Sequence, residues 1–315
     1  MHPALSVIFF TTASGAGYGL LTILGLGYLL HIVPDNFAFG LTAIGIALTL
    51  ITTGLLSSTF HLGHPERAWR ALSQWRSSWL SREGVLAIIT YIPILVFASK
   101  WLIEESDDEI YTLAAMSMSV LCVMTVYATS MIYASLKTVH AWCNHWVPLA
   151  YLSLALMTGI VLLNALLLIF APSVPLITYI TLGSIVLALG IKVAYWRYID
   201  QTKSSSTAET ATGLGHLGKV SMVQSPHSQE NYLLKEMGYQ IARKHADKLR
   251  RITLLCGFVL PFILIAMSLT NILLLARGCA LLAVISCMFG VVIERWLFFA
   301  EARHTVMLYY GNSTA

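Results

Sequence analysis

The stretch His61–Gly84, HLGHPERAWRALSQWRSSWLSREG, decides the fold, because it lies as a polar loop between two long apolar runs. It contains two His, four Arg, two Glu and three Trp. Charged residues make up only 11% of the whole chain, so the polar chemistry is concentrated here rather than spread along the sequence. We therefore expect this loop to connect two membrane spans and to carry functional groups.

The composition outside the loop indicates an integral membrane protein. Of the 315 residues, 57% are hydrophobic, which is more apolar surface than a soluble core of this size can bury. Runs of about 20 apolar residues, enough for a helix to cross the bilayer, recur along the chain. The runs are continuous rather than alternating, which favours helices over a β-barrel. The sequence predicts an all-α polytopic protein, without haem, with eight transmembrane helices in two four-helix groups.

The expected spans can be placed to within a few residues. Seven of them are about 6–31, 39–60, 83–103, 110–133, 147–170, 253–275 and 278–299, and the sixth in chain order follows the turn at 172–175 and ends near 195.

The expected domains divide the chain into residues 1–133, with the polar site, and residues 134–315. The second part includes a soluble segment, 198–252. Residues 202–229 of this segment, rich in Ser, Thr and Gly, predict a flexible linker. Residues 231–251 predict a basic amphipathic helix, which would lie on membrane lipid or against a partner protein.

The basic residues predict the orientation. With eight spans, all Lys and Arg except Lys100 and Arg277, 17 of the 19, lie on the side that holds both termini. The positive-inside rule then places the termini, the loop at 61–84 and the segment at 198–252 in the cytoplasm.

His61 and Glu83 are the candidate catalytic pair. His61 closes the second span and Glu83 opens the third at the same membrane face, so neighbouring helices would bring an imidazole and a carboxylate together. Both groups can exchange protons, which suits proton-coupled redox chemistry of a quinone. Arg67, Trp69 and Trp79 are supporting candidates, since indoles favour the membrane interface. The alternative is a structural ion pair that anchors the loop, and a second possible site lies beside His140 and His145.

Other functional classes find less support. The five cysteines form no CxxC pair and no cluster with His at ligand spacing, so neither a zinc site nor an iron–sulfur cluster is expected. All ten His lie at span ends or in loops, which disfavours a haem held inside the bilayer. A small-solute transporter is the main alternative from another class, and a purely structural anchor remains open. Nothing indicates nucleic-acid binding.

Two short strings resemble a known family. His61–Ala68, HLGHPERA, and Leu80–Glu83, LSRE, are similar to the HLGxPxRA and LSxE motifs of the dimethyl sulfoxide reductase membrane anchor subunits. The eight-helix plan and Arg295–Phe299 with His304 also resemble that family, and the resemblance covers essentially the whole chain. The opening residues and the long loop before the seventh span look closer to the branch that serves cytoplasmic sulfite dehydrogenases.

The resemblance implies a heterotrimer. Its partners would be a molybdopterin catalytic subunit and an iron–sulfur subunit, and this haem-free anchor would exchange electrons with ubiquinone or menaquinone in a bacterial inner membrane. Substrate chemistry would occur in a partner, with sulfite oxidation ranked ahead of sulfoxide reduction. The family's quinone-site His and Glu correspond to His61 and Glu83. His64 stands where other members often have a small residue, and Arg67 is carried over as a motif residue.

Overall fold

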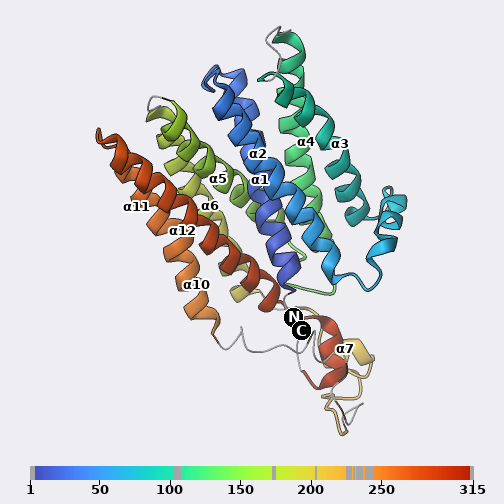
Figure 1. The fold of residues 1–315 in the computed structure, drawn as a ribbon. Coiled ribbons are helices and arrows are strands. Elements are labelled where there is room, and N and C mark those ends of the chain that lie inside the picture. Colours follow the sequence, from blue (N-terminus) through green and yellow to red (C-terminus); the bar gives the residue numbers. More distant parts are fainter. Residues whose placement is uncertain are drawn as a thin grey trace.

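The computed structural model describes residues 4–101, 108–171, 175–202, 204–224 and 245–312, together with residues 229, 231 and 237. Within them the protein is all-α, and eight helical segments are long and apolar enough to cross a membrane, as the sequence predicts (Figure 1). The helices are α1 (Leu5–Leu29), α2 (Phe37–Ser57), α3 (Trp79–Ser99), α4 (Asp108–Ala134), α5 (Trp146–Phe170), α6 (Pro175–Gln201), α7 (Ala208–Thr212), α10 (Ala246–Leu254), α11 (Leu260–Met267) and α12 (Leu273–Ala300). Short 3₁₀ segments are η1 (Ser58–His61), η2 (Pro65–Gln74) and η4 (Thr305–Tyr310), and η3 (Leu255–Val259) is a π-helical turn.

We use the term terminal face for the side on which α1 begins and α12 ends. Both chain ends lie on this side in Figure 1, together with α7 and the loop that connects α2 to α3. Residues 102–107 and 172–174, which include part of the expected acidic loop and one expected turn, lie outside the described residues.

The seventh and eighth spans begin earlier than the sequence suggests. The expected turn near residue 277 was wrong: the structure makes the turn between Met267 and Leu273, and Arg277 lies inside α12. Arg277 donates from Nε and Nη2 to the carbonyls of Leu168 and Ile169, at 2.9 and 3.1 Å. These carbonyls belong to the last turn of α5, where they lack helical partners, so the guanidinium caps that helix.

The segment 198–252 differs in part from expectation. Within the predicted flexible linker, α7 forms because the side chains of Thr207 and Thr210 each bond the other's backbone N–H. The Tyr309 hydroxyl donates to the Ala211 carbonyl at 2.9 Å and ties α7 to η4. Of the predicted amphipathic helix, only Asn231, Met237 and 245–251 are described, and 246–251 form the beginning of the seventh span itself.

Helices α1 and α5 form the centre of the array, because most of their residues are buried while the other spans expose much of their surface. The two backbones touch at glycines. A Cβ on Gly19 would lie 1.8 Å from the Ala155 carbonyl oxygen, and a Cβ on Gly159 would lie 2.1 Å from the Gly19 carbonyl carbon. Such contact is possible only without side chains, as at the small-residue interfaces of membrane helices.

The remaining helices pack around this centre. Helix α2 packs mainly on α1, and α3 packs mainly on α4. Helices α2 and α3 contact each other sparingly, although the hydroxyls of Thr52 and Tyr91 are 2.8 Å apart and join them. Helix α1 contacts α4, α5 and α12, so parts of both expected four-helix groups meet along it. The division after residue 133 stays a prediction.

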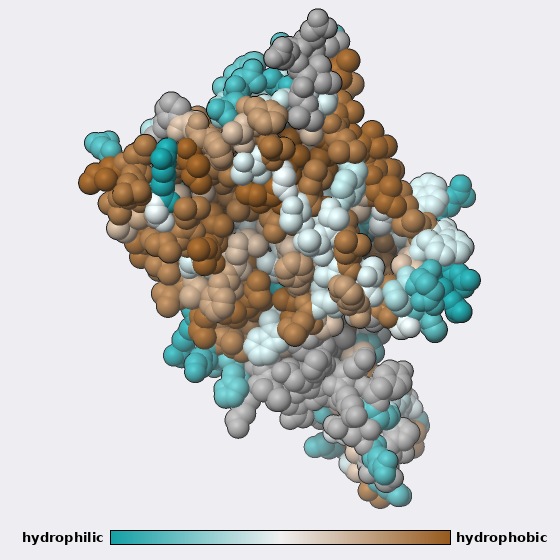
Figure 2. Space-filling view, in the orientation of Figure 1, coloured by the Kyte–Doolittle hydropathy of each residue, from teal (hydrophilic) through white to brown (hydrophobic). Residues whose placement is uncertain are grey.

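The outer surface fits a bilayer. In Figure 2 the hydrophobic colour covers most of the helices in this view, and hydrophilic residues gather toward the ends and over the protruding loop at the right. Side chains such as Ile92, Leu187 and Leu274 are exposed by 65%, 63% and 83% on helices that bury polar groups inside. The protein therefore turns its apolar groups to lipid and its polar ones inward.

Gly159→Ala is expected to destabilise the fold, because the added methyl group meets the backbone of α1, which cannot rotate away. We expect a loss of about 1–3 kcal/mol, typical of an overpacked core, measured by thermal unfolding of purified protein in detergent. Gly183→Ala is the matched control, since no atom lies within 4 Å of a Cβ there. Equal melting temperatures for the two variants would contradict the tight α1–α5 contact.

Candidate functional site

Glu83 lies one turn inside α3, near the terminal face, and is only 5% exposed. It shares the buried face of the helix with Ala87 and Thr90, which turns toward α4. The Thr129 hydroxyl on α4 donates a short hydrogen bond to Glu83 Oε1. One turn deeper, the hydroxyls of Thr90 and Thr125 lie 3.3 Å apart. The carboxylate is therefore held between two membrane helices and away from lipid.

Three tyrosines surround this carboxylate. Tyr18 on α1, Tyr133 on α4 and Tyr151 on α5 all lie within electrostatic range of Glu83. The ring of Tyr133 stacks on that of Tyr151, with centroids 5.8 Å apart. Glu83 thus faces the aromatic centre of the protein, where α1, α4 and α5 meet.

The loop between α2 and α3 is exposed to solvent. None of the residues of η2 is buried, and Trp69 is 67% exposed. The side chains of His64 and Arg67 are 69% and 57% exposed, and both lie near the Glu66 carboxylate, at 3.0 and 3.8 Å. Leu72 holds η2 against α3, because a Cβ on Gly84 would come within 2.7 Å of its methyl group. Of the expected supporting residues, His64, Arg67 and Trp69 stand away from Glu83.

Trp79 and Arg82 fasten the loop to the helix. The Arg82 guanidinium lies over the Trp79 ring, 4.3 Å from its centroid, and donates to the carbonyls of Trp75 and Arg76 at 3.0 and 2.7 Å. The Trp79 ring also contacts that of Tyr127 edge-on, at 5.9 Å. Trp79 is thus the expected supporting residue that lies in the first turn of α3, beside Glu83.

His61 ends η1, but its side chain lies outside what the structure describes. The expected meeting of His61 and Glu83 therefore stays a prediction. The second possible site has structural contacts of its own: His140 Nε2 lies 2.9 Å from the Thr202 hydroxyl, and the ring of His145 contacts that of Trp146.

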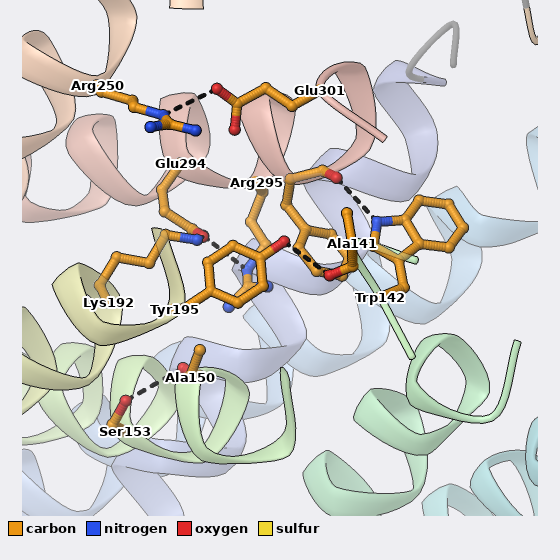
Figure 3. Close-up of polar contacts among 11 residues, drawn as sticks. Ala141, Trp142, Ala150, Ser153, Lys192, Tyr195, Arg250, Glu294, Arg295 and Glu301 are labelled. Carbon is orange, nitrogen blue, oxygen red and sulfur yellow. Dashed lines mark hydrogen bonds and ion pairs between the residues drawn. The ribbon is translucent and has the colours of Figure 1, made fainter. Parts of the chain in front are cut away.

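A buried group of charges lies in the other half of the helix array. Lys192 on α6 forms an ion pair with Glu294 on α12, and Arg295 Nε lies 3.2 Å from the other oxygen of Glu294. All three side chains are at most 2% exposed. Figure 3 shows them pointing toward one another. We call Lys192, Glu294 and Arg295 the buried charge cluster; its net formal charge is positive, and charges at this depth are costly unless paired.

Aromatic rings share the excess positive charge. The Lys192 ammonium lies 4.1 Å from the centroid of the Tyr195 ring, and the Arg295 guanidinium lies 3.7 Å from that of Tyr151. Ring faces attract cations, and this attraction is stronger where water is excluded. Trp142 closes the end of this region by donating from Nε1 to the Phe298 carbonyl at 2.9 Å (Figure 3).

A second ion-pair group lies at the terminal face. Arg250 makes two hydrogen bonds to Asp200, of 2.7 and 3.0 Å, and one of 2.9 Å to Glu301. These contacts join α6, α10 and the end of α12. Burial raises the pKa of the Glu301 carboxyl above its ordinary value, and the Arg250 guanidinium limits that rise.

The buried charge cluster was not predicted from the sequence. Lys192 was placed at the edge of its span, and both Lys192 and Arg295 were counted among the basic residues of one face. The signal that could have found it was the adjacent pair Glu294 and Arg295 inside an apolar run, since ionisable residues within a span indicate pairing or function. No group of three or more His, Cys, Asp or Glu that could hold a metal ion occurs in the described part of the chain.

Comparison with known proteins agrees with this architecture. Residues 1–311 match the family model described as DMSO reductase anchor subunit (DmsC). The chain belongs to this family. The anchor subunit is also similar to a sulfite dehydrogenase component of Allochromatium vinosum, the one designated C, with 31% identity over 335 aligned positions and 99% of both chains. No solved structure matches it.

Membership bears on the chemistry. Anchor subunits of this family interact with quinone. In this anchor subunit Glu83 belongs to the LSRE string that carried the resemblance, and it is a buried, hydrogen-bonded carboxylate. The HLGHPERA string, by contrast, lies in the exposed connection from η1 to η2.

The buried charge cluster predicts unequal effects of two substitutions. Lys192→Met leaves Glu294 and Arg295 as a neutral pair, whereas Glu294→Gln leaves two buried cations without a carboxylate. We expect Glu294→Gln to cost about 3–5 kcal/mol, as for a broken buried ion pair, and Lys192→Met to cost less. Chemical unfolding of the purified anchor measures both. A larger loss for Lys192→Met would show that the charge balance assigned to the cluster is wrong.

Proposed function

We propose that this anchor is the quinone-reactive membrane subunit of a molybdenum-containing oxidoreductase. It passes electrons between an iron–sulfur subunit and the quinone pool, most directly in sulfite oxidation. The observation that carries the proposal is the buried Glu83 carboxylate, located in a family string at the membrane edge directly after an exposed polar loop. The full-length similarity to a component of a sulfite dehydrogenase supports the choice of substrate.

The surroundings of Glu83 fit a group that exchanges a proton. Its partner Thr129 has a second acceptor within reach, the Thr125 carbonyl at 3.0 Å. A hydroxyl has one hydrogen and two lone pairs. It can therefore donate to an ionised Glu83, or accept a hydrogen bond from a protonated Glu83 while it donates to Thr125. Both protonation states of the carboxyl keep a partner without any movement of the helices.

A quinone takes up two protons with two electrons, and this chain's residues would supply them. Glu83 acts as one proton-exchanging group, and His61, at the end of the second span, acts as the other. Trp79 bounds the site at the membrane interface and, through its contact with Arg82, fixes the start of α3. His64, Arg67 and Trp69 belong to the exposed loop and bear on the site from its outer side.

The exposed loop is the proposed docking surface for the iron–sulfur subunit. It presents several cations and two large indoles to solvent, including Arg67, Trp69 and Trp75. An electron must pass from the partner to a site next to Glu83, so the partner has to lie close to this loop. The segment 231–251 is a second proposed contact, with either the partner or membrane lipid. A molybdopterin catalytic subunit is the third member of the complex.

The proposed orientation puts the terminal face in the cytoplasm of a bacterium, with the protein in the inner membrane. Basic side chains such as Arg67, Arg70 and Arg76 are exposed on this face, which is where the positive-inside rule expects them. The partner subunits would then bind on the cytoplasmic side. A reductase anchor that oxidises quinol, as the family description allows, is the alternative direction of electron flow.

Glu83→Gln is expected to lower quinone-linked turnover by about 100-fold, since loss of a positioned acid–base group costs roughly 10²–10⁴-fold. The amide keeps the shape and the hydrogen bond with Thr129 but carries no exchangeable acid proton. His61→Ala should likewise abolish quinone-linked transfer. Turnover of the purified complex with a soluble quinone, against dye-linked activity of the catalytic subunit, separates these effects from failed assembly.

Glu66→Gln is the control for these variants, because this carboxylate belongs to the same loop but is 62% exposed. It should leave turnover and assembly unchanged. Normal quinone turnover in assembled Glu83→Gln complex would mean that the carboxylate is structural, and the site would then have to be sought elsewhere.

The direction of electron flow can be measured on the complete complex in membranes. We expect sulfite-dependent reduction of quinone, and we expect this reaction to disappear in the Glu83→Gln complex. Quinol oxidation coupled to reduction of a sulfoxide, without any activity toward sulfite, would favour the reductase alternative.

A further inference from the structure

A small cavity lies between α1, α4, α5 and α12, close to the terminal face. Its volume is about 10 Å³, and a buried water molecule needs roughly 10–15 Å³. The polar side chains that line it include Thr11, Thr12, Thr129, Tyr151, Thr158 and Arg295. The cavity therefore has the size and the polarity for one water molecule.

Three of the lining residues each offer a buried polar atom without a hydrogen-bond partner in the described part of the chain. These atoms are Thr12 Oγ1, Tyr151 Oη and Arg295 Nη1. Their residues are only 4%, 4% and 2% exposed. The Arg295 guanidinium lies over the face of the Tyr151 ring, 3.7 Å from its centroid. Buried polar groups are rarely left unpaired, and a buried water typically bonds about three of them.

The other threonines of the cavity differ in this respect. Thr11 donates to the backbone carbonyls of Val7 and Ile8 at 2.9 and 3.2 Å, and Thr158 donates to that of Leu154 at 2.9 Å. Their hydroxyls are satisfied within their own helices. Thr12, Tyr151 and Arg295 therefore form a three-point polar site contributed by α1, α5 and α12.

Thr129 connects this site to Glu83. Its hydroxyl donates to the Glu83 carboxylate, and the same residue lines the cavity. A water bound by Thr12, Tyr151 and Arg295 would thus lie on the other side of Thr129 from the carboxylate.

We propose that this cavity is a water-binding site, and that its water and the Thr129 hydroxyl relay protons to and from Glu83. The inference rests on the proposed role of Glu83 in quinone chemistry and adds the route by which that carboxyl is recharged. Thr12, Tyr151 and Arg295 are positioning residues for the water.

The relay conserves protons and charge. When Glu83 has given up its proton, the Thr129 O–H bond breaks and the proton passes to the carboxylate. Thr129 then takes a proton from the water, and the water regains one from the solvent at the terminal face. No electrons move in these steps, and the cavity ends with the charge it began with. Arg295 stabilises the partial negative charge on the oxygen that has given up its proton, because its guanidinium stays protonated.

Thermal unfolding of Thr12→Val tests the water site without any quinone. If the cavity is dry, Thr12 buries an unsatisfied hydroxyl, and the isosteric valine should raise the melting temperature. If water is bound, valine removes one of its partners, and we expect the melting temperature to fall or stay the same. Thr11→Val is the matched control, one residue away in the same cavity. A rise for Thr12→Val above wild type and above Thr11→Val overturns the proposal.

A high-resolution experimental structure of the complex gives a direct readout. We expect density for a water within hydrogen-bonding distance of Thr12 Oγ1 and an Arg295 nitrogen, and its loss in Thr12→Val. A well-resolved cavity without water in the wild-type protein overturns the inference.

Quinone turnover then tests the relay. We expect Thr12→Val to slow turnover by about tenfold, less than the roughly 100-fold lower limit for losing an acid–base group, with Thr158→Val close to wild type. Equal turnover in Thr12→Val and Thr158→Val, together with a slow Glu83→Gln, speaks against the relay alone. Full turnover in Glu83→Gln speaks instead against the proposed function, and the melting and structural tests of the water site still stand.

Discussion

The close contact between the backbones of α1 and α5 is the constraint on which the rest of the structure depends. Gly19 and Gly159 remove the side chains that would hold these helices apart. Without a hydrophobic force between helices in lipid, such contact and interhelical hydrogen bonds must supply the association. With α1 and α5 together, α4 and α12 are brought to the same place from opposite sides. This is the place where Thr129 and Arg295 line one cavity.

The second organising feature is the depth at which polar groups are buried. Glu83, Thr129, Tyr151, Lys192 and Arg295 all lie within a few turns of the helix ends at the terminal face. The cost of a buried charge decreases toward the interface, and ion pairs and ring faces reduce it further. One carboxylate stays outside this pairing: Glu83 is matched by a hydroxyl rather than a cation. A carboxyl with a neutral partner gains and loses a proton more readily than one fixed by a salt bridge, which suits the role proposed for it.

The two charged regions play different parts. Lys192, Glu294 and Arg295 tie α6 to α12, and Arg250 with Asp200 and Glu301 ties α10 to both near solvent. These contacts hold the later helices in register. Through Arg295, the same cluster reaches the cavity next to Glu83, so that a structural ion pair and the proposed proton route share one side chain.

The sequence by itself determined the membrane class, the eight spans and the family, because apolar runs of spanning length and the strings HLGHPERA and LSRE are local features. It also singled out Glu83, since a carboxylate at a span edge stands out by type and position. Only the tertiary structure decided what Glu83 faces. Thr129 is far away in the sequence, and a lone threonine in a span gives no signal of its partner. The turn before α12 was misplaced because leucines on both sides hide it, and Arg277 found its partners on α5. The buried charge cluster and the cavity exist only where several helices meet, and a helix crossing depends on side-chain shapes that hydropathy does not record.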